Sequence, residues 1–112
     1  MSKFDEKVQM YKDDVAKLGL KISDDLLTKV SKSLGPSIYL GDASLVSGSD
    51  QAELDRLKNN FLIKKLGLKD GPSLDKAISE TINDMGTSNR NKHRAIFYSL
   101  LVIKLGKESF FK

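Results

Sequence analysis

The spacing of apolar residues predicts helices along most of the chain. Near the N-terminus they recur every three or four positions, at Phe4, Val8, Tyr11, Val15 and Leu18. Residues with this spacing lie on one face of a helix. The pattern therefore predicts a helix over 3–18, with Ser2 as its N-cap and Gly19 after its last turn.

A second helix is predicted from Ser23 or Asp24 to about Leu34, where a glycine-proline pair stops it. Residues 37–48 have no helical period, but they are too apolar for a disordered linker. We expect them to pack on the core as an ordered connection that includes a short helical turn. A β-hairpin centred on Gly41-Asp42 is the alternative, and it is disfavoured because two short strands alone are marginally stable.

Two further helices are predicted over 50–66 and 72–85. Ser49 or Asp50 caps the first of them, and Pro72 suits the opening turn of the second. Each has apolar residues at helical spacing, so each is expected to bury one face.

The stretch from Ser88 to Leu105 is expected to organise the rest of the chain. Residues 89–94 are polar and basic, whereas 95–103 are almost entirely apolar. We interpret the whole stretch as one long helix capped by Thr87 or Ser88. A helix that is apolar on nearly all sides must be covered by other elements. The sequence therefore predicts an all-α fold, a single-domain bundle of about five helices over 1–112 with a largely buried C-terminal helix.

Composition limits the class of protein. A chain of 112 residues is close to the usual size of one domain. It has no cysteine, which excludes disulfides and thiolate chemistry. The charged N-terminal segment lacks the apolar centre of a signal peptide, and no apolar run approaches the roughly 20 residues that cross a bilayer. These features predict a cytoplasmic protein with no membrane segment.

Charge is distributed unevenly between the two halves of the chain. Residues 1–56 hold 8 lysine and arginine residues against 10 aspartate and glutamate, a net charge of −2. Residues 57–112 hold 11 against 5, a net charge of +6. This asymmetry permits an anionic partner, including nucleic acid, for the second half. It equally permits attraction between the halves or between two copies of the chain, or a solvated surface with no partner.

The residues that build common enzyme sites are mostly missing. His93 is the single histidine, so the usual His/Cys zinc site cannot form, and no glycine-rich phosphate motif occurs. The acidic pairs Asp13-Asp14 and Asp24-Asp25 diverge on a helix and do not converge on a substrate. The sequence therefore predicts no catalytic residues, no metal site and no cofactor, in a protein that is not an enzyme.

One polar cluster is a candidate anion-binding site at the expected start of the last helix. Its members are Ser88, Asn89, Arg90, Lys92, His93 and Arg94. A helix N-terminus with free N–H groups beside basic side chains suits phosphate or carboxylate. The alternative is internal, because Glu80, Asp84 or the acidic first half of the chain offers partners for the arginines.

Three irregular segments carry a resemblance to a known family. They are LLTKVSKSLGPSIY, GSDQAELDRLKNNFLIKKLGL and SNRNKHRAIFYSLLVIKLGKES. In this order they resemble the small bacterial proteins grouped as domain-of-unknown-function family 2853. The similarity runs from about Tyr11 to Ser109. The resemblance implies a compact, mainly helical domain, and it implies no activity and no catalytic residues.

Two hypotheses about function follow. The first is a non-enzymatic interaction or regulatory protein that binds a protein partner or a second copy of itself. The terminal pair Phe110-Phe111 is relevant to it, because these rings either dock on the core or form an exposed patch. The second is an anion or nucleic-acid binder that uses the basic cluster at 88–94.

Overall fold

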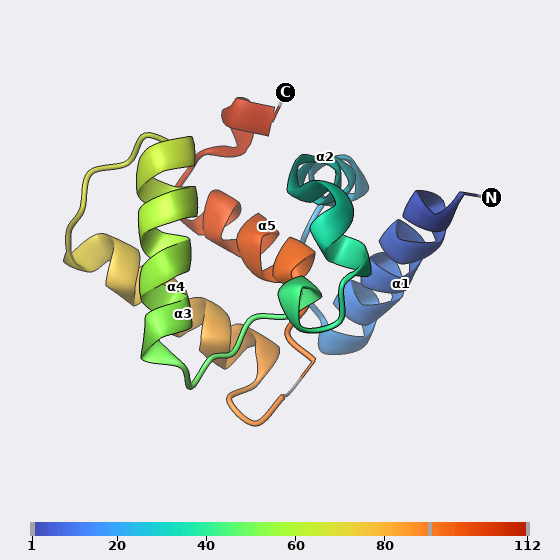
Figure 1. Ribbon diagram of the computed structural model, residues 1–112, viewed down its shortest axis with the longest axis horizontal. Helices are drawn as coiled ribbons and strands as arrows, with labels where there is room; N and C mark the ends of the chain where they lie inside the picture. The colour runs from blue at the N-terminus through green and yellow to red at the C-terminus, as the bar shows by residue number, and fades with distance from the viewer. Residues whose placement is uncertain (1, 90, 112) are drawn as a thin grey trace.

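Five α-helices follow one another in the computed structural model, which describes residues 2–89 and 91–111. They are α1 (Lys3–Leu18), α2 (Asp24–Leu34), α3 (Gln51–Leu57), α4 (Pro72–Met85) and α5 (Arg94–Lys104). Figure 1 shows α5 at the centre, with α1 and α2 on one side and α3 with its continuation on the other. The predicted all-α fold with a central last helix is confirmed. None of the described helices combines the length and the apolar composition needed to cross a bilayer.

The first two helices begin and end at the residues predicted from the sequence. The Ser2 hydroxyl accepts the N–H of Asp5 at 3.1 Å, and the Ser23 hydroxyl accepts the N–H of Leu26 at the same distance. Gly19 ends α1 in the left-handed region, at φ 69°, which residues with a Cβ rarely adopt. Short-range capping chemistry is therefore sufficient to set these helix ends.

The connection between α2 and α3 is ordered and covers part of the core. It contains two 3₁₀ turns, η1 (Gly35–Tyr39) and η2 (Asp42–Ser44). Ile38 and Val46 are buried, at 1% and 3% exposure. The expected ordered cover is confirmed, and a hairpin is not formed by residues 37–48.

The helix predicted over 50–66 forms in two parts. α3 passes directly into η3 (Lys58–Lys65), which has the wider π-helical winding. A regular α-helix of about 3.6 residues per turn would carry Leu62 and Leu66 away from the face of Leu57. The wider turn, closed between residues five apart, returns them to it. Leu57, Leu62 and Leu66 are all buried.

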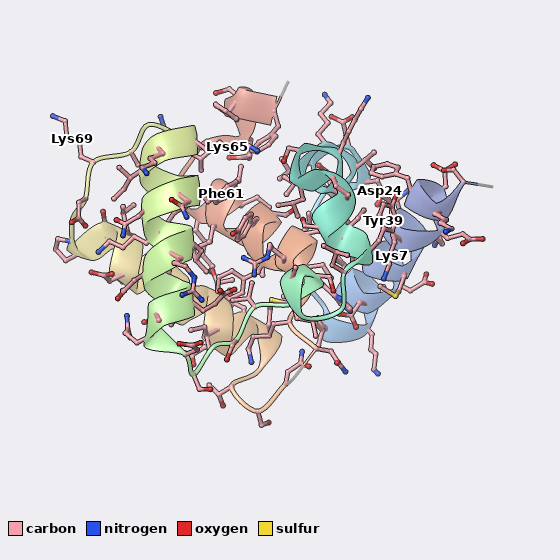
Figure 2. All side chains as sticks on the ribbon, viewed as in Figure 1. Lys7, Asp24, Tyr39, Phe61, Lys65 and Lys69 are labelled. Atoms are coloured by element: carbon pink, nitrogen blue, oxygen red, sulfur yellow. The ribbon has the colours of Figure 1, made fainter. Side chains whose placement is uncertain are left out.

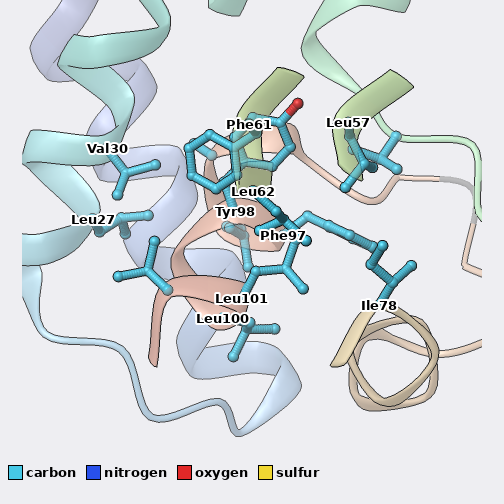
Figure 3. Packing of buried hydrophobic residues seen from close by; sticks show 14 of the residues in the cluster. Leu27, Val30, Leu57, Phe61, Leu62, Ile78, Phe97, Tyr98, Leu100 and Leu101 are labelled. Atoms are coloured by element: carbon cyan, nitrogen blue, oxygen red, sulfur yellow. The ribbon is translucent and has the colours of Figure 1, made fainter. Parts of the chain in front are cut away.

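The core surrounds α5, which is buried continuously over residues 95–102. Figure 3 shows side chains from several helices meeting at this point. Phe61 stacks on Tyr98 with the ring centroids 4.0 Å apart and the ring planes 20° from parallel. This contact joins η3 to α5 and fixes the position of the central helix.

The last helix begins later than the sequence predicted. We expected it to start at Ser88 with Thr87 or Ser88 as its cap, whereas α5 starts at Arg94 and His93 is its N-cap residue. The physical reason lies in Asn89, whose side chain bonds the backbone of neighbouring residues and competes with helix formation. Residues 88, 89, 91 and 92 therefore lie outside the helix, and of the described members of the basic cluster only His93 and Arg94 stand at the N-terminus of α5.

Of the two C-terminal phenylalanines, one packs on the core and the other is exposed. η4 (Glu108–Phe111) brings Phe111 against the core, where it is partly buried. Phe110 is 48% exposed. One ring therefore docks and holds the end of the chain, and the other faces solvent.

Candidate functional site

The structure divides the predicted anion-binding residues among three surroundings. Ser88, Asn89 and Lys92 lie together on one cleft. His93 packs against α1, and Arg94 forms an ion pair with α3. Arg90 lies outside the described residues. Half of the cluster thus remains together in space.

The cleft lies between residues 45–49, which lead into α3, and residues 87–89 and 92, which precede α5. In Figure 1 these are the green segment below η2 and the orange loop at the bottom of the view. Its volume is about 730 Å³, within the range of small-molecule sites. The lining residues are Leu45, Val46, Ser47, Gly48, Ser49, Ile82, Thr87, Ser88, Asn89 and Lys92. The lining thus combines hydroxyl groups, an amide and an ammonium with apolar side chains.

Asn89 shapes the loop that forms one wall of the cleft. Its Nδ2 donates to the carbonyl of Met85 at 3.0 Å, which satisfies an acceptor at the end of α4. Its Oδ1 accepts the N–H of Asn91 at 2.9 Å. The backbone N–H of Asn89 also donates to the carbonyl of Gly86 at 3.0 Å. These bonds give the loop a defined shape without regular secondary structure.

Lys92 is the unusual member of the cleft because it is a lysine with only 3% exposure. Its ammonium donates to the carbonyl of Asn89. Within the described part of the chain, no carboxylate lies within 4.0 Å of this ammonium. Burial lowers the pKa of Lys92. An ammonium has three N–H donors, so a buried one with a single acceptor among the residues that the structure describes has capacity for an anion.

The two walls of the cleft are held together across its base. The N–H of Val46 donates to the carbonyl of Lys92 at 2.8 Å, and Leu45 pairs with His93 in an isolated antiparallel bridge. The guanidinium of Arg94 donates to the carbonyl of Ala43 at 2.8 Å and to that of Leu45 at 3.1 Å. The cleft is therefore preformed by contacts that do not depend on a ligand.

Arg94 also joins α5 to α3. Its guanidinium pairs with the carboxylate of Glu53, and it donates to the hydroxyl of Tyr98 at 2.8 Å. Glu53 belongs to the acidic first half of the chain, so the internal alternative is confirmed for Arg94. This arginine is a structural residue behind the wall of the cleft.

His93 faces away from the cleft toward α1. Its ring lies 5.3 Å from the ring of Tyr11, measured between centroids. Burial lowers the pKa of His93, and the nearby Asp14 carboxylate opposes part of that effect. Burial, with a smaller contribution from Tyr39, raises the pKa of Tyr11 to about 12. This pair belongs to the packing of α1 on the loop before α5.

The other described positive charges of the second half, leaving aside Arg90 and Lys112, do not line the cleft. Lys58 pairs with Asp70 at 2.9 Å and Asp75 at 3.1 Å, and Lys104 pairs with Asp84 at 2.6 Å. Figure 2 shows Lys65 and Lys69 at the top of the view, whereas the orange segment that follows α4 lies at the bottom. The described part of this positive charge is thus spread over the surface and partly paired.

The opposite wall of the cleft was not predicted from the sequence. Residues 47–49 read Ser-Gly-Ser, a composition typical of any turn before a helix. At Gly48 an added Cβ would lie 3.4 Å from Cγ2 of Ile82 and 3.4 Å from Cε of Lys92. The missing Cβ at this position lets the side chains of Ile82 and Lys92 pack directly over Gly48, and all three residues line the cleft.

Comparison with known proteins agrees with the resemblance seen in the sequence. A family model described as "Protein of unknown function (DUF2853)" matches residues 10–109. A search of curated proteins gave no match. Because the family model covers nearly the whole chain, the protein belongs to this family, whose description assigns no activity.

Proposed function

We propose that this protein is a non-enzymatic binding protein that holds a small anion in the cleft lined by residues 45–49, 87–89 and 92. Lys92 carries the proposal, because a buried ammonium without a carboxylate partner among the described residues favours an anionic ligand. Hydroxyl groups of Ser47, Ser49 and Ser88 line the same cleft and are suitable donors. The cytoplasmic location expected from the sequence is part of this proposal.

A small anion is favoured over nucleic acid as the ligand. A nucleic-acid surface needs several exposed cations that follow the phosphate backbone. Here Arg94, Lys58 and Lys104 are engaged in ion pairs with carboxylates. The single buried ammonium of Lys92 suits one small group better than a polymer.

Titration of the ¹⁵N-labelled protein with sodium acetate and inorganic phosphate, at constant ionic strength, tests the anion site. Saturable shifts of the backbone amide signals over 45–49 and 87–92 are expected. Lys92→Met should abolish them, because it removes the charge while keeping a side chain of similar length. The same shifts in the Lys92→Met protein, or none in the wild type, would contradict the proposal.

Two glycine variants provide a matched control for this cleft. Gly48→Ala adds a methyl group against Ile82 and Lys92, and it should weaken anion binding. At Gly41 an added Cβ meets nothing within 4 Å, so Gly41→Ala should bind as the wild type does. Equal affinities for the two variants would place the anion elsewhere. Short DNA and RNA, followed by fluorescence anisotropy at low and high salt, should not bind.

Binding of a protein partner is the second candidate function, and a specific surface supports it. Met10 and Tyr39 line a shallow groove and are 38% and 43% exposed, while neighbouring Leu40 is 58% exposed. Apolar groups gathered on a surface are typical of protein interfaces. Sedimentation velocity and capture from a native lysate test this function. A strict monomer that retains no partner would contradict it.

A further inference from the structure

The geometry points to an amphiphilic monocarboxylate as the ligand of the cleft: a small acid whose apolar tail lies on Ile82 and whose carboxylate meets Lys92. This inference rests on the proposed anion site and names the chemical class that fits it. Apolar and cationic groups lie side by side in the lining, and each kind suits one part of such an acid.

The apolar part of the cleft adjoins its charged part. The position that a Cβ on Gly48 would take lies 3.4 Å both from Cγ2 of Ile82 and from Cε of Lys92, so these two side chains adjoin each other over this residue. Ile82 is only partly buried, although it belongs to the apolar face of α4. Leu45 and Val46 extend the apolar lining along the facing wall. A ligand that reaches Lys92 through this cleft therefore contacts branched aliphatic side chains on the way.

The charged part of the cleft suits a single negative charge. Lys92 is the one cation among the described lining residues, and the remaining polar groups there are neutral hydroxyls, an amide and the backbone. Among these described groups a doubly charged phosphate would find one counterion for its two charges, which is unfavourable in a partly desolvated site. A carboxylate is matched by one ammonium with hydroxyl donors beside it.

A series of acids of increasing chain length measures the apolar and the charged contributions to affinity separately. The dissociation constants of acetate, butanoate and hexanoate are determined with the full-length protein by the amide-shift titration, with hexan-1-ol as the uncharged probe. Each methylene that becomes buried should raise the affinity about fourfold. Hexanoate is therefore expected to bind at least tenfold more tightly than acetate, and also more tightly than hexan-1-ol.

Ile82→Ser tests the apolar contact directly. This variant should bind acetate within about twofold of the wild type and lose most of the gain with chain length. Its amide spectrum reports whether it is folded, and the series measured on the wild type decides the question if it is not. Inorganic phosphate is expected to bind more weakly than butanoate.

The outcomes separate this inference from the function on which it rests. If acetate and hexanoate bind equally and Lys92→Met abolishes both, the anion site stands and the inference is wrong. The inference also fails if hexan-1-ol binds as tightly as hexanoate, because the charge is then not recognised. If none of the acids and no phosphate binds, both the proposed function and the inference fail.

Discussion

Arg94 and Glu53 form an ion pair between the first turn of α5 and the helix α3, and each side chain is only 16% exposed. The same guanidinium bonds two backbone carbonyls in the segment that leads into α3 and the hydroxyl of Tyr98. One arginine thus connects the central helix to two elements that lie far from it in the sequence. A charge held in this way is costly to leave without its partner.

Replacement of Glu53 should destabilise the protein strongly. Glu53→Gln leaves the Arg94 guanidinium largely buried without a counterion, and we expect the free energy of unfolding to fall by about 3 kcal/mol. Arg56→Gln is the matched control, because Arg56 pairs with the same carboxylate but is 62% exposed. It should cost less than about 1 kcal/mol. Urea unfolding measures both variants, and equal losses would contradict a structural role for the inner pair.

The stacked pair of Phe61 and Tyr98 should also contribute strongly to stability. Phe61→Ala removes a buried ring from the contact between η3 and α5 and should cost about 3–5 kcal/mol. Phe110→Ala, at an exposed ring of the same type, should change the stability by less than about 0.5 kcal/mol. Thermal and urea unfolding report the difference. A small effect of Phe61→Ala would mean that the described packing of η3 is incorrect.

A pH dependence is expected from His93. A histidine whose pKa is lower in the folded state binds fewer protons there than in the unfolded chain. Its contribution to stability is therefore complete above the unfolded pKa of about 6.5, and it is lost as the pH falls through the folded pKa. We expect a lower urea midpoint near pH 5.5 than near pH 7.5, and His93→Gln should flatten that slope.

The same expectation is open to direct observation, because His93 is the only histidine of the chain. Its ring-proton NMR signals should titrate with a midpoint below about 6.5. A midpoint at or above that value would show that the Asp14 carboxylate outweighs burial. Carboxylates that titrate at lower pH act in both the wild type and His93→Gln, so the difference between the two isolates the histidine.

Helix ends that depend on local chemistry were predictable from the sequence. The hydroxyls of Ser2 and Ser23 and the ring of Pro72 act within a few residues, and the helices that they begin were predicted correctly. The π-helical winding of η3 was not predictable, because it follows from how Phe61 and Leu62 fit against the other helices. The helix propensities of single residues do not depend on that packing, so they do not predict a π-helical turn.

The site was partly predictable for the same reason. Ser88, Asn89 and Lys92 are close in the sequence, and they were predicted together. Asn89 was interpreted as part of a helix, although its side-chain bonds to the backbone are a known reason for asparagine to interrupt one. Gly48, on the facing wall, comes from a distant part of the chain. The spacing of residues along the sequence does not predict that Gly48 lies beside Lys92, because only the fold brings them together.

The buried ammonium of Lys92 should lower the stability of the folded protein. Its pKa is lowered by burial, which means that the folded state disfavours the ammonium relative to the unfolded chain. Lys92→Met removes this penalty with a side chain of similar length, and we expect the free energy of unfolding at pH 7 to rise by about 1 kcal/mol. Lys76→Met, on the exposed face of α4, should change it by less than about 0.5 kcal/mol.

Thermal unfolding and urea titration at pH 7 measure this effect, and saturating hexanoate distinguishes its cause. The wild type and Lys76→Met should be stabilised by the acid, because a ligand that binds only the folded state raises its stability. Lys92→Met should start from a higher Tm and gain nothing. A Lys92→Met protein that is less stable than the wild type would mean that the bond to the Asn89 carbonyl holds the loop, and Lys92 would then be a structural residue rather than a ligand contact.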